Sequence, residues 1–320
     1  MELRASRRAV VAGGLAGLAS ACAPRPPATF FTPSRRPIGI QLYSVAKEAN
    51  ADLDGTLAAI AAIGYRTVEI AGYIGKTPSD LRAALDRAGL RCTSAHVPGK
   101  PFRPTPRTLD DDPGVLAEEA QILGFKTVIM PLFVTPDRLP IVLRPGDDVR
   151  KVVGGVLAQM RESDWLAVAD YMNAKGAALK KVGLNFGYHN HGTEFGPAVG
   201  GTGSIIELLI ARTDPGLVNF QLDCGWAVSA GVDPAAFIRK HKGRIRSLHL
   251  KDVAMTNVPN FDSRIDPAEI GNGITDWPGL LAAARDYGVE NYFVEQEAPY
   301  IRPVLDSLRD NFRFLSTIVT

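Results

Sequence analysis

Cysteine is scarce in this chain, which has three cysteines among 320 residues. Cys22 adjoins a proline-rich stretch, whereas Cys92 and Cys224 fall inside or at the end of short runs that we predict to be strands. Three cysteines in these positions do not have the regular spacing of a disulfide framework. We therefore interpret Cys92 and Cys224 as small core residues.

A strong excess of charge is also lacking, because the formal net charge is only +2. The first 22 residues carry Arg4, Arg7 and Arg8 against Glu2, so the remainder holds equal numbers of basic and acidic residues. A neutral domain of this kind gives no electrostatic reason to bind nucleic acid. The hydrophobic content of 46% allows a sizeable core, which favours one large catalytic domain.

A long apolar run is lacking at the N-terminus, where the run after Arg7 and Arg8 ends at Ala21 and is rich in glycine and alanine. Such a run is too short for a stable membrane span. An arginine pair before a short run of small apolar residues is typical of a twin-arginine export signal. We predict that residues 1–21 are removed and that the protein is exported to the periplasm. An uncleaved amphipathic N-terminus is the alternative.

The cleavage point has two interpretations. Ala19-Ser20-Ala21 suits a small-x-small cleavage site, whereas Leu18 to Cys22 resembles a lipoprotein box with its leucine one place too early. A lipid on Cys22 would then be the protein's contact with a membrane. Residues 22–36 are rich in proline and have no apolar period, so we predict an extended tether before a domain at 37–320.

From Ile38 onward, short β-like runs alternate with longer helical patterns, which is the sequence form of βα units. Eight such units predict an α/β fold, the closed (β/α)8 TIM barrel, whose catalytic residues lie at the C-terminal ends of the strands. The predicted strands are Ile38–Tyr43, Thr67–Ile70, Arg91–His96, Thr127–Pro131, Asn185–His191, Val218–Asp223, Ile245–Lys251 and Tyr292–Glu297.

Glycines mark the ends of several predicted helices, each at the place where a left-handed residue would end the helix. Two connections are longer than an ordinary βα loop: 135–163, which we interpret as an active-site loop with a partial helix at Val149–Met160, and 253–276. The helices that precede a glycine are Asp52–Ile63, Pro78–Ala88, Pro113–Leu123 and Trp165–Lys181.

Polar residues gather at the predicted strand ends. The stretch Leu184–Phe195 runs from an apolar strand into His189 and His191, whose side chains should point the same way in an extended segment. A pair of surface histidines in a loop is the alternative. In a barrel, the strand ends meet at one mouth, so their side chains should converge. The other residues in this set are Gln41, Tyr43, Glu69, His96, Asp223, Trp226, His249, Lys251, Glu295 and Glu297.

Four of these residues form a plausible ligand set for one divalent cation: His189, Asp223, His249 and Glu295. Carboxylates and imidazoles suit Mn²⁺ first, with Mg²⁺, Co²⁺ or Zn²⁺ as alternatives, and leave open positions for substrate oxygens. Each residue also has an ordinary structural interpretation. Asp223 could cap a helix, and Glu295 could pair with an arginine.

The sequence resembles the sugar phosphate isomerase/epimerase superfamily, which has a xylose isomerase-like barrel. The resemblance covers residues 37–320, and its motifs as a set are specific for the superfamily but weak for any one substrate. The motifs are Gly39–Ser44, Gly64–Glu69, Tyr188–His191, Leu222–Trp226, His249–Asp252 and Val294–Glu297.

The resemblance implies a metal-dependent isomerase or epimerase that abstracts a proton next to a carbonyl and passes through an enediolate. Glu295 or Glu297 would be the base, and Lys251 or His96 would handle the oxygen-bound proton. A salt bridge from Lys251 to Asp252 or Glu295 is the structural alternative. Substrate contacts are expected from Gln41, Tyr43, Glu69, His191 and Trp226.

One ligand departs from the superfamily pattern. In ketose epimerases the strand-five ligand is a glutamate that shares acid and base work with the strand-eight glutamate, whereas His189 stands here. The other three ligands match Asp223, His249 and Glu295. A histidine at this position can still bind a metal ion. The two-glutamate proton shuttle of the ketose epimerases, however, would lack its strand-five member.

An exported enzyme would meet unphosphorylated sugars, so we predict a free sugar, a keto-sugar or an oxidised glycoside as the substrate. A 3-keto-glycoside lyase or an inosose-type dehydratase on the same barrel is the alternative enzyme. A non-catalytic periplasmic sugar-binding protein is a further alternative. An abasic-DNA endonuclease shares the barrel, but it needs three metals and a basic groove. A monomer and a homo-oligomer are both open at this stage.

Overall fold

The computed structural model describes residues 29–320, apart from 33–34 and 199–202. The predicted export signal and Cys22 lie outside the described residues. Eight parallel strands close into a barrel in the order β1-β10-β7-β6-β5-β4-β3-β2, as the TIM-barrel prediction requires. The barrel strands are β1 (Gly39–Gln41), β2 (Thr67–Ile70), β3 (Arg91–His96), β4 (Thr127–Met130), β5 (Asn185–His189), β6 (Asn219–Asp223), β7 (Ile245–Leu250) and β10 (Asn291–Val294).

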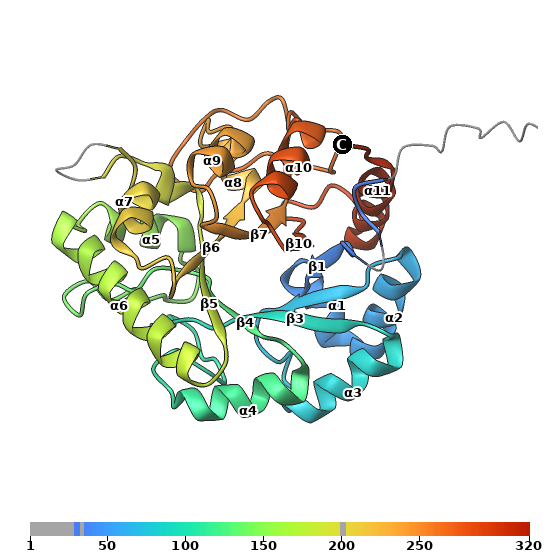
Figure 1. Cartoon of the computed structure of the whole chain (residues 1–320), viewed down its shortest axis with the longest axis horizontal. Coiled ribbons are helices and arrows are strands. Elements are labelled where there is room, and N and C mark those ends of the chain that lie inside the picture. The colour runs from blue at the N-terminus through green and yellow to red at the C-terminus, as the bar shows by residue number, and fades with distance from the viewer. Residues whose placement is uncertain (1–28, 33–34, 199–202) are drawn as a thin grey trace, which may run out of the picture.

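Helices surround these strands on the outside (Figure 1), and closure of the barrel encloses the inner face, so residues on both faces of the sheet are shielded from water. One 3₁₀ helix, η1 (Leu42–Val45), follows β1 directly, and a second, η2 (Gly192–Phe195), follows β5 after two intervening residues. The α-helices are α1 (Ala46–Ala51), α2 (Leu53–Ile63), α3 (Pro78–Ala88), α4 (Pro113–Leu123), α5 (Val149–Leu157), α6 (Glu162–Lys181), α7 (Ile205–Arg212), α8 (Cys224–Ser229), α9 (Pro234–Lys240), α10 (Trp277–Asp286) and α11 (Val304–Thr317).

The ends of α3 and α4 agree with the sequence prediction because local signals set them. Each helix starts with a proline after a capping residue, Thr77 for α3 and Asp112 for α4. Gly89 and Gly124 follow these helices with φ of 70° and 94°, values that favour glycine. The helix α6 begins earlier than predicted, because the Asp164 carboxylate accepts a hydrogen bond from the backbone N–H of Arg161 at 2.7 Å.

Five strands are shorter than predicted at the functional end of the barrel: β1, β4, β5, β7 and β10. β5 ends at His189 and β10 at Val294, whereas the sequence predicts strands that continue to His191 and Glu297. The last residue pair between β10 and β7 joins Val294 to Leu250. Beyond these points the chain leaves the sheet, so the polar residues that follow lie around the mouth of the barrel.

The described part of the predicted tether packs on the barrel. Phe30 and Phe31 are buried, and each ring makes an edge contact with Tyr292 at a centroid distance of 5.4 Å. The backbone N–H of Phe30 donates to the carbonyl of Ile318 at 2.7 Å. The core therefore includes residues before 37, which the proline content of this stretch did not indicate.

The long connection after β7 is organised around Asp252. It contains a short antiparallel pair, β8 (Asp252–Val253) and β9 (Pro267–Ala268). The Asp252 carboxylate accepts hydrogen bonds from Thr275 Oγ1 at 2.7 Å and Trp277 Nε1 at 2.8 Å, and from two glycine N–H groups of the same connection. One buried carboxylate thus holds the far end of the loop against the end of β7.

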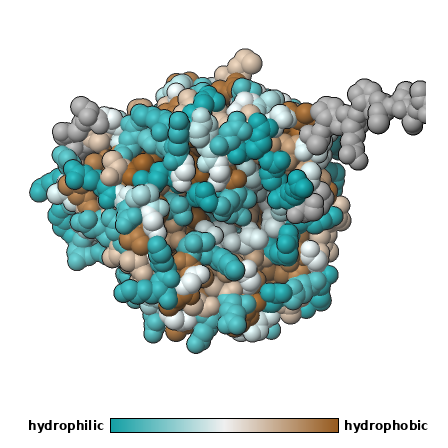
Figure 2. Space-filling model, viewed as in Figure 1, coloured by the Kyte–Doolittle hydropathy of each residue, from teal (hydrophilic) through white to brown (hydrophobic). Residues whose placement is uncertain are grey.

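The face seen in Figure 2 is covered mainly by hydrophilic residues, with hydrophobic ones in small groups. Among the described residues, no helix combines the length and the apolar character needed to cross a membrane.

Candidate active site

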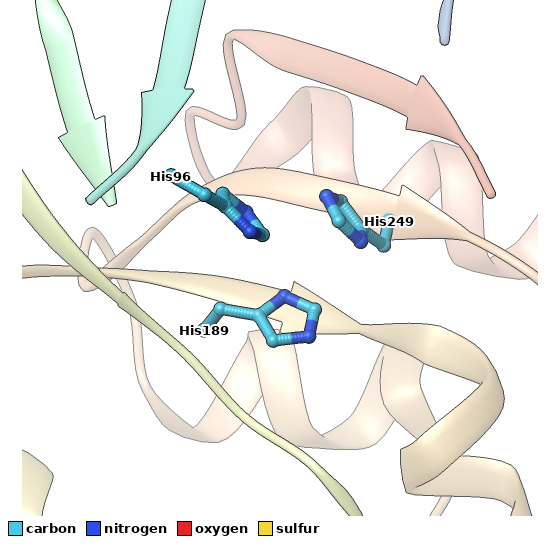
Figure 3. Close-up of side chains that lie close together, drawn as sticks. All are labelled: His96, His189 and His249. Carbon is cyan, nitrogen blue, oxygen red and sulfur yellow. The ribbon is translucent and has the colours of Figure 1, made fainter. Parts of the chain in front are cut away.

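Three histidines from separate strands point toward one another inside the barrel (Figure 3). His96 ends β3, His189 ends β5 and His249 lies near the end of β7. The His249 ring is 4.6 Å from the His189 ring and 5.5 Å from the His96 ring, centroid to centroid. The convergence of strand ends that the sequence predicts is therefore present for these side chains.

His249 also belongs to a second group, with Asp223 and Glu295. One ligand atom from each of the three residues lies within 4.8 Å of the others. His249 Nδ1 is 3.0 Å from Glu295 Oε2 and 3.8 Å from Asp223 Oδ2. Two carboxylates and an imidazole at these separations have the donor chemistry that holds a divalent cation.

Asp223 performs two tasks with its two oxygens. Oδ1 caps α8 by accepting the backbone N–H of Trp226 at 2.8 Å. Oδ2 is buried and has no hydrogen-bond donor among the described residues, although an ammonium lies beside it at poor hydrogen-bonding geometry. The helix-cap interpretation and the ligand interpretation are thus compatible, because they use different oxygens.

That ammonium belongs to Lys251, which is buried between three carboxylates. Its Nζ is 3.0 Å from Asp223 Oδ2, 2.9 Å from Glu295 Oε2 and 3.0 Å from Glu297 Oε1. It also lies 4.8 Å from the centroid of the Trp226 ring. Burial alone would lower the pKa of Lys251, but the three carboxylates hold it well above its usual range. Of the two predicted salt-bridge partners, Glu295 contacts Lys251.

The carboxylates respond to the same charges. Burial raises the pKa of Asp223 to about 6, and Lys251 offsets part of that effect. Burial would also raise the pKa of Glu295, but Lys251 and His249 outweigh it and hold the pKa well below its usual range. Glu297 is more exposed, with 23% of its side chain accessible. The group therefore offers one buried and one partly exposed glutamate near the same ammonium.

His189 occupies a different position from the other three predicted ligands. Its Nδ1 lies 3.0 Å from Gln221 Oε1, and it forms a cluster with His96 and His249, with ligand atoms within 4.8 Å of one another. Burial, with a further contribution from His249, lowers the pKa of His189 well below its usual range. Its neutral ring can therefore bind a cation, and the two clusters share His249. The assignment of His189 as a ligand stays a prediction.

The predicted substrate contacts divide into two layers. Gln41 and Glu69 are fully buried and bond to each other at 2.8 Å, so in this arrangement they contact protein groups. Tyr43 is 57% exposed at the mouth, and partial burial, followed by the charge of Glu297, raises its pKa. Trp226 is 6% exposed.

Two unpartnered nitrogens lie near this mouth. Trp226 Nε1 and His191 Nδ1 are both buried and have no hydrogen-bond partner among the described residues. The two rings are 5.9 Å apart, centroid to centroid. Burial, followed by the charge of Lys251, lowers the pKa of His191 to about 4. Substrate contacts from His191 and Trp226 stay predictions.

Three residues of this region were not predicted as site residues. Gln221 bonds to His189, Ser94 donates to Glu69, and Asn190 accepts the backbone N–H of Asp223 at 3.1 Å. Each is a polar residue in or directly after a buried strand, and a polar residue in such a stretch is an unusual feature that can indicate a site. Alternation along the strand could not tell which face they occupy, because both faces of a barrel strand are buried.

The comparisons with known proteins agree with this architecture. Residues 57–318 match the family described as xylose isomerase-like TIM barrels. A sugar phosphate isomerase/epimerase from Parabacteroides distasonis ATCC 8503 is 25% identical, with a TM-score of 0.68 over 88% of this chain and 97% of that one.

Two further similarities concern sugar chemistry and metal. An inosose dehydratase from Geobacillus kaustophilus is 27% identical over 206 residues, which are 62% of this chain and 62% of that protein. The match thus spans less than two thirds of the dehydratase. The IOLI protein, whose crystal structure holds a zinc atom, is 14% identical with a TM-score of 0.59 over 88% of this chain and 98% of that one. At that identity the likeness shows the fold alone.

Proposed function

The chain belongs to the family of xylose isomerase-like TIM barrels, and on that basis we propose that it is a divalent-metal-dependent enzyme that isomerises or epimerises a sugar. The substrate class is a free sugar, a keto-sugar or an oxidised glycoside. The reaction begins with abstraction of the proton next to a carbonyl. We propose that the enzyme works in the periplasm after export.

The observation that carries this function is the group formed by Asp223, His249 and Glu295, with Lys251 beside it. Its ligand atoms lie within 4.8 Å of one another, and one of them, Asp223 Oδ2, is buried without a hydrogen-bond donor. The Lys251 ammonium, 3.0 Å from this oxygen, balances part of the negative charge of the buried carboxylates, and a divalent cation would balance more of it. Asp223, His249 and Glu295 would hold the ion, with His189 as the fourth ligand.

A divalent cation bound to these residues supplies Lewis-acid polarisation of a carbonyl oxygen. Glu295 takes the carbon-bound proton, and the more exposed Glu297 is the second carboxylate that can exchange a proton with substrate or solvent. The Lys251 ammonium lies within 3.0 Å of both glutamates. A substrate that reaches these glutamates would also lie near the ammonium, which would stabilise negative charge that develops on the substrate oxygen. Tyr43, His191 and Trp226 contact the sugar at the mouth.

A dehydratase acting on an inosose, or a lyase acting on a 3-keto-glycoside, is the second candidate. Two observations favour it: relatives named inosose dehydratase, and a histidine in place of the strand-five glutamate. Both candidates share the first proton abstraction. They differ in whether the proton returns to the sugar or a neighbouring hydroxyl or alkoxyl group leaves.

The variant Asp223→Asn tests the ion-binding proposal and separates the two tasks of this residue. Asparagine caps helices about as well as aspartate, so α8 should keep its cap, and Lys251 keeps Glu295 and Glu297 as charged partners. Loss of the charge on Oδ2 should weaken Mn²⁺ binding by at least about 10-fold, measured by titration calorimetry on the purified protein. Wild-type affinity in Asp223→Asn would contradict the proposed ligand set.

A further inference from the structure

Glu69 is a fully buried carboxylate that reaches across the barrel from β2. Its neighbours come from four other strands: Gln41 on β1, Ser94 on β3, Gln221 on β6 and His249 on β7. It has no exposed surface. A side chain that touches four other strands of a closed barrel lies near its axis, beneath the predicted ligands.

Both oxygens of Glu69 are occupied by donors. Oε1 accepts Gln41 Nε2 at 2.8 Å and His249 Nε2 at 2.6 Å, and His96 Nε2 lies 3.0 Å away. Oε2 accepts Ser94 Oγ at 2.5 Å and Gln221 Nε2 at 2.9 Å. So many donors fix the carboxylate in position and favour its charged form, because hydrogen bonds to a carboxylate stabilise the anion.

The contact with His249 sets the direction of that ring. Nε2 faces Glu69, so Nδ1 faces Glu295 Oε2 at 3.0 Å and Asp223 Oδ2 at 3.8 Å. A histidine ligand binds a cation through one nitrogen, and the partner of its other N–H fixes the ring and its tautomer. The two nitrogens of His249 thus have separate partners on opposite sides.

We propose that Glu69 is a positioning residue for the metal centre: it holds the proton of His249 on Nε2 and presents Nδ1 to the cation beside Asp223 and Glu295. This role rests on the proposed metal-dependent function. It replaces the substrate contact that the sequence suggests for Glu69, since the structure leaves this carboxylate no surface toward the mouth. Through Gln221, the same carboxylate is connected to His189, which bonds to the amide oxygen at 3.0 Å.

The variant Glu69→Gln tests this role, because a glutamine has one acceptor where the carboxylate has two and cannot receive all of the surrounding donors. Mn²⁺ affinity, measured by calorimetry, should fall by about 10- to 100-fold. Glu69→Asp keeps the charge but withdraws the oxygens by one methylene group, so it should also weaken binding. It serves as the second variant if Glu69→Gln does not fold.

The matched control is Glu119→Gln, which removes another buried carboxylate. Glu119 is 8% exposed and accepts the Tyr73 hydroxyl at 2.6 Å and Arg107 at 2.8 Å. It lies outside the ligand clusters, so this variant should lose stability without losing Mn²⁺ affinity. If Glu119→Gln lost as much Mn²⁺ affinity as Glu69→Gln, general destabilisation would explain both losses. That result would overturn the proposal.

The identity of the His249 nitrogen that binds the ion can be measured directly. A purely structural role of Glu69 would leave it unchanged. In the Zn²⁺-loaded wild type, ¹⁵N NMR should show His249 bound through Nδ1 with its proton on Nε2. In Glu69→Gln this signal should weaken or split. Unchanged affinity and an unchanged signal in Glu69→Gln would overturn the positioning role and leave the proposed function standing. A wild-type protein that binds neither ion would overturn both.

Discussion

At the scale of single residues, Lys251 dominates the charge balance of the site. Only 2% of its side chain is exposed, and its ammonium lies within 3.0 Å of three carboxylates. Taking a charge into the interior is expensive unless it is paired, and removal of one partner leaves the others uncompensated. Lys251 therefore stabilises the folded protein before any cation binds.

The variant Lys251→Met should reduce the free energy of unfolding of the metal-free protein by about 3 kcal/mol, since removing one partner of a buried pair typically has a cost of this order. Addition of Mn²⁺ should recover part of that loss, because the cation then neutralises the same carboxylates. Urea denaturation with and without EDTA measures both effects.

The control for this variant is Lys240→Met, which removes a surface ion pair. Lys240 is 65% exposed and pairs with Glu207, so its replacement should change the stability by less than about 1 kcal/mol. Equal stability of Lys251→Met and wild type in EDTA would contradict the role given to Lys251.

The grouping of Asp223, His249 and Glu295 was accessible from sequence, because strand ends of a barrel share one mouth. The positions of Glu69 and Gln221 were not. The depth of a mid-strand side chain depends on how far neighbouring strands are staggered, which sequence spacing does not state. Gln221 packs between His189 and Glu69. It lies 152 positions from Glu69 in the sequence, so no local pattern connects the two residues.

At the scale of elements, local signals predicted the helices better than the strand ends. Proline, capping residues and glycine mark both ends of α3 and α4. A strand ends where it stops pairing with its neighbour. The end of β5 therefore depends on β6, and the end of β10 depends on β7. The connection after β7 is a further case, since its organisation depends on Asp252 and on donors that lie about twenty residues later along the chain.

The variant Asp252→Ala should loosen this connection. It leaves the Trp277 indole N–H and several backbone N–H groups without an acceptor, and each buried unpaired group costs about 1–3 kcal/mol. We expect a loss of at least about 3 kcal/mol in urea denaturation and faster proteolysis between residues 254 and 276.

Asp266→Ala is the control within the same connection. Asp266 receives an exposed hydrogen bond from Thr256 at 3.0 Å, and its loss should change the stability by less than about 1 kcal/mol. Similar proteolysis of Asp252→Ala and Asp266→Ala would argue against Asp252 as the anchor.

At the scale of the whole molecule, the alternation of short strands and helices predicted the closed barrel correctly. Closure itself is made by β1, in which Gly39 pairs with Phe293 of β10 on one side and Thr67 of β2 on the other. The packing of Phe30 and Phe31 beneath the barrel was missed, because an irregular stretch has no periodicity to reveal its buried residues.

Export is a property of the whole chain, and it depends on residues outside those the structure describes. We predict that the double variant Arg7→Lys, Arg8→Lys stays in the cytoplasm, because a twin-arginine signal requires both arginines. Cell fractionation and immunoblotting measure the distribution. A double variant that reaches the periplasm in wild-type amounts would replace the twin-arginine signal by a general secretory one.

The most direct test of the central claim is hydrogen exchange with solvent during turnover. The protein is loaded with Mn²⁺ and incubated in D₂O with an inosose or a 3-keto-glucoside, and the sugar is followed by NMR and mass spectrometry. Proton abstraction next to the carbonyl predicts deuterium at that carbon, or loss of its hydrogen in an eliminated product. Exchange should stop with EDTA and fall far more in Glu295→Gln than in Glu297→Gln. An isomerised sugar that keeps its original hydrogen, with no deuterium, would contradict the claim and indicate a hydride shift between carbons.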